Sequence, residues 1–155
     1  HPFVAAALDP AYPMVLVRHG ERNSQVRNEF EAKLVGMLAE GLIRREKDVV
    51  DGMGVVVPHR AQRAAIGAML QGMVDPEQAT LAMEAVDTVE RFQGGERDAI
   101  VVSATESDPV YLLNSGGFLY DPTRLTVALS RARHKLVLVA AGSVFELFSP
   151  DDELY

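Results

Sequence analysis

Four short polar segments follow or precede apolar runs of the chain, and each carries side chains that could contact phosphate or move a proton. They are RHGERN at 18–23, PHRAQR at 58–63, ERFQGGERD at 90–98 and RLTVALSRAR at 124–133. Arginine recurs in all four, and its planar guanidinium suits bidentate contacts with phosphate oxygens. Ligands of an open α/β sheet bind beyond the carboxyl ends of the strands, so residues that follow strands are the first candidates for chemistry.

Two of these segments have features beyond their arginines. In Gln93-Gly94-Gly95-Glu96, the glycines lack side chains, so backbone amides can approach a ligand, and Glu96 adds an acceptor beside them. The alternative for the glycines alone is a plain turn. Arg124 and Arg131 lie seven residues apart on an expected helix, so we expect them to share one face. A solvated arginine stripe is the alternative there.

Composition limits the class of protein. A chain of 155 residues with 48% hydrophobic and 24% charged residues is typical of one globular domain. No apolar stretch approaches the roughly 20 residues that span a bilayer, so we expect no membrane contact and an intracellular, cytoplasmic location. The net charge of −7 argues against an extended basic surface for nucleic acid, so any such contact must be local. The absence of cysteine excludes thiolate chemistry.

Apolar runs alternate with helical patterns along most of the chain. Strands are predicted at 14–19, 53–57, 98–103 and 135–141, with a further strand ending near 86–89. Helices are predicted from Asn28 to Gly41, over 61–70, and from Asp121-Pro122 to about Arg133. Glu31 three residues after Asn28 indicates a cap at that helix start. The polar segment 105–120 is predicted to be a loop. This alternation predicts an α/β fold with a parallel sheet.

Taken in order, the segments resemble the second RecA-like domain of superfamily 1 helicases, in the Upf-like and RecD-like branch. PMVLVRHGERNSQVRNEFEAKLV resembles its opening strand and helix, GVVVPHRAQRAAI its motif IV, VDTVERFQGGERD its motif V and RLTVALSRARHKL its motif VI. The resemblance implies a three-layer α/β/α RecA-like (P-loop NTPase-like) domain with a mainly parallel sheet of about five or six strands. It assigns 14–148 to this domain, leaving a proline-containing lead-in at 1–13 and an acidic tail at 149–155.

The same resemblance implies roles for individual residues around ATP. Arg63 of motif IV and Arg131 of motif VI would reach the γ-phosphate as arginine fingers, which stabilise the charge that develops as the phosphoryl group leaves. Gly94, Glu96 and Arg124 would contact the nucleotide.

Other residues of these motifs would contact single-stranded DNA or RNA. Thr88 would hydrogen-bond a backbone phosphate, with His59 and Arg60 beside it, and such contacts position a strand without reading its sequence. His59 stands where the family usually has tyrosine, and Ser130 where it usually has threonine. No residue is expected to bind a metal.

The phosphate-binding lysine loop of such enzymes is missing. No G-x-x-x-x-G-K-[ST] occurs, so this chain alone is predicted to be inactive as an NTP hydrolase. ATP with Mg²⁺ would be bound mainly by an N-terminal RecA-like domain of the same protein, outside this chain.

Two other readings stay open. LVRHGERN at 16–23 resembles the signature of histidine phosphatases, with His19 as the nucleophile and His59 as a second histidine. Only about 40 residues separate the two, fewer than that family needs, and the region after Val86 would be unexplained. Otherwise His19 is expected to be a loop residue. The third reading is a nucleic-acid-binding module that kept the fold but lost activity.

Overall fold

Five apolar runs form a sheet in which all the described strands are parallel. The computed structural model describes residues 1–45, 49–92 and 95–146, so the predicted acidic tail at 149–155 lies outside it. The strands are β1 (Met14–His19), β2 (Met53–Val57), β3 (Val86–Thr88), β4 (Arg97–Ser103) and β5 (Ala132–Ala141). Their order is β1-β5-β4-β2-β3. The predicted α/β fold with a parallel sheet is confirmed.

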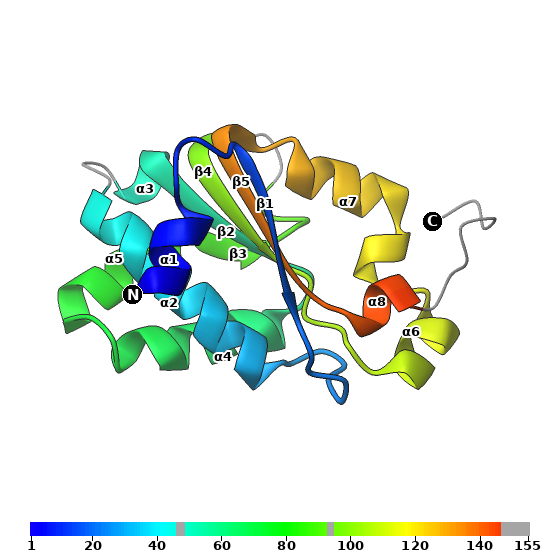
Figure 1. The fold of residues 1–155 in the computed structure, drawn as a ribbon. Helices are drawn as coiled ribbons and strands as arrows, with labels where there is room; N and C mark the ends of the chain where they lie inside the picture. The colour runs from blue at the N-terminus through cyan, green and yellow to red at the C-terminus, as the bar shows by residue number, and fades with distance from the viewer. Residues whose placement is uncertain (46–48, 93–94, 147–155) are drawn as a thin grey trace.

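Helices cover both faces of this sheet, which makes three layers (Figure 1). One face is covered by α1 (Pro2–Ala7), α2 (Glu29–Arg45), α4 (Arg60–Gln71) and α5 (Pro76–Glu84). The other face is covered by the 3₁₀ helix η1 (Phe118–Tyr120) and by α7 (Pro122–Leu129). The other helices of the described residues are α3 (Val49–Gly52), α6 (Pro109–Ser115) and α8 (Ser143–Glu146).

Helix α2 starts where the sequence predicts and ends later. The Asn28 side-chain oxygen accepts a hydrogen bond from the Glu31 amide at 2.9 Å, which confirms the predicted cap. The helix continues past Gly41 to Arg45 because Gly41 is a packing site and not a stop. A Cβ on Gly41 would lie 2.6 Å from Cγ1 of Val4, so its absence lets α1 lie against α2. Part of the predicted lead-in therefore packs on the domain.

The prediction of a loop over 105–120 is wrong, because α6 and η1 lie within it. The Asp108 carboxylate caps α6 by accepting from the amides of Val110 and Tyr111, and Pro109 occupies its first turn. Asp75-Pro76 starts the unpredicted α5 in the same way. The signal recognised at Asp121-Pro122 thus occurs at two further helix starts.

The helix predicted from Asp121 to about Arg133 is also too long. It ends at Leu129, and β5 begins at Ala132, three residues earlier than predicted. The backbone of this stretch pairs with β4 instead: the Arg97 amide donates to the Arg131 carbonyl at 2.9 Å. Arg131 therefore lies in the turn after α7, and the argument that it shares a helix face with Arg124 is wrong.

Candidate nucleotide and nucleic-acid sites

The predicted site residues divide between the two ends of the parallel sheet. Glu96 and Arg131 lie at the end where β4 and β5 begin, which we call the amino edge. Thr88 and His59 lie where β3 and β2 end, which we call the carboxyl edge. Helix α7 runs from one edge to the other. The structure therefore brings the predicted residues together as two groups.

Arg131 at the amino edge carries a guanidinium without a carboxylate partner among the described residues. Its Nε donates to the Val127 carbonyl at 3.2 Å and its Nη2 lies 3.0 Å from the Ser130 hydroxyl. Both contacts are to neutral groups, so the positive charge is left for an external anion. Such a group fits a nucleotide phosphate.

Glu96 stands next to Arg131 because the two chain segments pair. The amide of Arg97, the residue after Glu96, donates to the Arg131 carbonyl. Arg97 is held in turn by the ring of Phe92, 5.3 Å from its guanidinium carbon. Gly94, the third residue predicted near the nucleotide here, lies outside the described residues.

Arg124 and Arg63 lie away from this pair. Arg124 is near the start of α7, where its Nη2 donates to the Pro58 carbonyl at 3.0 Å and its Nε lies 2.8 Å from a Glu90 oxygen. Arg63 donates to the carbonyls of Val86 and Met83, both at 2.7 Å, and so caps the end of α5. Its predicted contact with a γ-phosphate would require both bonds to break.

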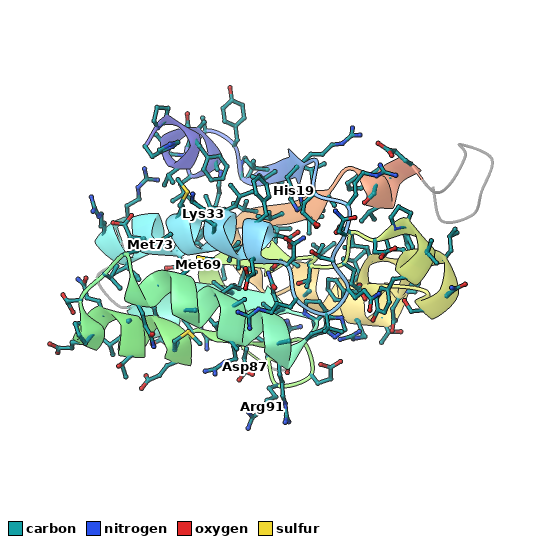
Figure 2. The ribbon with its side chains drawn as sticks, turned by 90° about the horizontal axis from the view of Figure 1, so that it is seen from below. His19, Lys33, Met69, Met73, Asp87 and Arg91 are labelled. Carbon is teal, nitrogen blue, oxygen red and sulfur yellow. The ribbon has the colours of Figure 1, made fainter. Side chains whose placement is uncertain are left out.

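The carboxyl ends of β2 and β3 carry matched groups, of which Thr88 is buried and the two arginines that follow are exposed. Val57 and Thr88 are paired in the sheet, and the Thr88 hydroxyl makes no hydrogen bond to any described residue. Arg60 lies three residues after Val57, and Arg91 three after Thr88; both are exposed and neither side chain bonds to a described residue. Figure 2 shows Arg91 projecting beyond Asp87, away from His19.

Arg91 stands in the segment ERFQGGERD, but its sequence context alone does not indicate a place beside Arg60. Its equivalence to Arg60 depends on the register between two strands 31 residues apart, since Val57 pairs with Thr88. That register is not visible in the sequence of either segment.

His59 and His19 are each bound to a different carboxylate. The Nε2 of His59 lies 3.3 Å from a Glu106 oxygen. His19 is the buried last residue of β1, not a loop residue: its Nδ1 accepts from the Glu21 amide at 3.3 Å, so its Nε2 donates to Glu31 at 2.6 Å. Both ring nitrogens of His19 are therefore occupied, and the geometry gives the phosphatase reading no support.

Glu31 is the centre of a buried polar network that the sequence did not predict. Its second oxygen accepts from the Ser103 hydroxyl and from the Thr105 amide, both at 2.6 Å. Thr105 has a φ of 70°, a left-handed conformation that costs a non-glycine residue free energy unless its surroundings hold it. The network therefore fixes the chain as it leaves the central strand β4.

The side-chain amides of Gln62 and Asn28 extend this network across the carboxyl edge. The Gln62 side chain accepts from the Asn28 amide at 2.8 Å and donates to the Ser103 hydroxyl at 3.2 Å, and the Asn28 side chain donates to Glu21 at 2.9 Å. Burial acts to raise the pKa of Glu21, but hydrogen bonds, led by that from Ser107, outweigh it and lower the pKa. Glu21 therefore stays ionised and binds the loop after β1.

Comparison with known proteins identifies the domain. A family model described as an AAA domain matches residues 12–143. The chain belongs to this AAA domain family. The DNA replication ATP-dependent helicase/nuclease DNA2 of Mus musculus is 31% identical over 161 residues, which cover 99% of this chain. A Regulator of nonsense transcripts 1 homolog of Neurospora crassa is 39% identical over 93 residues, or 59% of this chain.

These relatives confirm the resemblance to the second RecA-like domain of a superfamily 1 helicase. The AAA domain spans only 14% of the mouse protein and 8% of the Neurospora protein. Within the described residues, no helix is both long and apolar enough to cross a membrane. Those residues also contain no group of three or more His, Asp or Glu side chains suited to a metal ion.

Proposed function

We propose that this AAA domain, over 14–148, is the second motor domain of an ATP-dependent DNA or RNA helicase or translocase. An N-terminal RecA-like domain of the same protein binds ATP with Mg²⁺, and this domain closes on it from the amino edge of its sheet. Hydrolysis of the bound ATP supplies the free energy for movement along a single strand. Its similarity to the mouse helicase/nuclease and to the Neurospora regulator of nonsense transcripts homolog supports this assignment.

The observation that carries the proposal is the separation of two kinds of site on one sheet. Arg131 and Glu96 share the amino edge, whereas Thr88, Arg60 and Arg91 share the carboxyl edge. A motor domain needs a nucleotide contact and a strand contact that are distinct but joined by a rigid scaffold.

At the amino edge, Arg131 acts as an arginine finger. Its guanidinium, which has no carboxylate partner among the described residues, stabilises charge on the transferring phosphoryl group. Glu96, next to Arg131, accepts a hydrogen bond from the nucleotide. Arg63 contacts the same phosphoryl group only if domain closure breaks its hydrogen bonds to the carbonyls of Val86 and Met83. Arg124 contributes to the nucleotide indirectly, through α7.

At the carboxyl edge, the groups face a nucleic-acid backbone. The Thr88 hydroxyl donates to one phosphate oxygen, and Arg60, with His59 beside it, faces the next part of the strand. Because these contacts go to the backbone, they serve DNA and RNA alike.

The test replaces Arg131 in the full-length protein. We expect Arg131→Ala to lower the kcat of nucleic-acid-stimulated ATP hydrolysis by about 10³-fold, since an arginine finger acts on the transition state. Binding of single strands should persist. Arg44→Ala is the matched control, because Arg44 is exposed on α2 and, among the described residues, forms an ion pair with Glu40 alone. Normal ATPase activity in Arg131→Ala would rule out the finger.

The same full-length protein tests the alternative that the domain is an inactive nucleic-acid-binding module. A wild-type full-length protein that binds single strands yet turns over no ATP would favour that module over the motor.

A further inference from the structure

A pocket of about 520 Å³ opens at the carboxyl edge, between the ends of β2 and β4 and the helices α6 and α7. Its lining includes His59, Glu106, Tyr111, Gly116, Tyr120 and Arg124. Apart from His59 and Arg124, these residues belong to none of the predicted contacts. The pocket adjoins the strand-binding edge, because His59 follows β2 and β2 pairs with β3, where Thr88 lies.

The floor of the pocket is acidic. The Glu106 side chain is only 5% exposed, accepts from the Phe118 amide and faces His59. Asp121 adds a second carboxylate to the lining. Burial and the charge of Glu106 raise the pKa of Tyr120 to about 12, so the phenol stays protonated. Carboxylates repel a phosphate and accept hydrogen bonds from N–H groups. A group that carries no negative charge and has N–H donors therefore fits this floor better than a phosphate does.

The walls of the pocket are flat. The rings of His59, Tyr111 and Pro122 line it, and a Cβ on Gly116 would meet no atom within 4 Å, so that side is open. Aromatic rings beside a strand-binding surface are the usual stacking partners of unpaired bases. Outside the pocket, Arg60 and Arg91, whose side chains bond to no described residue, follow the ends of the neighbouring strands.

The arginines outside the pocket suit the phosphate of a nucleotide, whereas the rings and carboxylates inside it suit the base. We propose that the pocket holds one nucleobase of the single strand, stacked on Tyr111, while the backbone of that strand lies along Thr88, Arg60 and Arg91. The inference rests on the proposed function, because it takes the bound ligand to be a single strand.

The experiment scans a strand with single abasic sites. The full-length protein binds a duplex with a single-stranded overhang, which fixes the register, and each overhang position is made abasic in turn. We expect one position at which loss of the base weakens binding about 5- to 150-fold, as base stacking contributes about 1–3 kcal/mol. In Tyr111→Ala that penalty should vanish, and in Tyr111→Phe, which keeps the ring, it should remain.

Val110→Ala is the matched control, because Val110 is the neighbouring residue on α6, is 66% exposed and does not line the pocket. Its abasic profile should equal that of the wild type. A flat wild-type profile, or one that Tyr111→Ala leaves unchanged, overturns the base pocket while strand binding and the ATPase test of Arg131 still support the motor. If intact strands do not bind at all, both proposals fail.

Discussion

Glu31 shows how much one buried carboxylate contributes to the carboxyl edge. It has no exposed surface and accepts from His19, Ser103 and the Thr105 amide. Removing one partner of a buried charged network leaves the others unsatisfied. We expect Glu31→Ala to lower the free energy of unfolding of this domain by about 3–5 kcal/mol in urea titrations.

Glu29→Ala is the control for that measurement, because Glu29 lies two residues earlier on α2 with a side chain that is 68% exposed. Its free energy of unfolding should change by less than about 0.5 kcal/mol. If both substitutions lowered the free energy of unfolding equally, the buried network would contribute no more to stability than an exposed glutamate does.

At this scale the sequence predicts local contacts well. Asn28 and Glu31 are three residues apart, so their cap could be predicted from spacing alone. The carboxylate of Glu31 is a different matter: its partners His19 and Ser103 are 12 and 72 residues away, and only the assembled sheet brings them together. The roles of Arg131, Glu96 and Thr88 come from resemblance and stay predictions until they are measured.

At the scale of elements, Gly54 lets the segment around Phe92 pack against β2. A Cβ on Gly54 would collide with the Phe92 ring and would lie 2.8 Å from Cδ1 of Ile100. We expect Gly54→Ala to destabilise the domain by about 1–3 kcal/mol in thermal or urea unfolding, since overpacking forces neighbouring side chains to move.

Gly20→Ala supplies the comparison for Gly54. A Cβ on Gly20 would meet nothing within 4 Å, so this second glycine change should leave the midpoint of unfolding nearly unaltered. If Gly54→Ala were as well tolerated, Phe92 would have to be free to shift away from β2.

The elements themselves were predictable where they depend on local signals. The runs at 14–19 and 53–57 became β1 and β2 with the predicted bounds. The end of α7 was not predictable, because Arg131 and Ala132 fit a helix by their own propensities and are taken by pairing with β4. The starts of α5 and α6 carry the same Asp-Pro signal as the start of α7, so both are predictable from local sequence.

At the scale of the whole chain, the net charge of −7 limits the proposed strand binding to contacts with a few local cations. Each phosphate neutralised on a single strand adds about −0.7 to the slope of log affinity against log salt concentration. We expect Arg60→Ala in the full-length protein to make this slope shallower by about 0.7, measured by fluorescence anisotropy across a salt series. Arg44→Ala should leave it unaltered, and an unaltered slope in Arg60→Ala would remove Arg60 from the strand contact.

Helix α7 connects the two edges of the sheet. Its eight residues span about 12 Å, its first turn holds Arg124 against the Pro58 carbonyl, and Arg131 lies two residues past its last turn. The chain between Arg131 at the amino edge and Asp121 and Pro122 in the wall of the pocket at the opposite edge is therefore almost entirely this one helix. One eight-residue helix thus separates the residue proposed to contact ATP from the wall of the pocket proposed to hold a base.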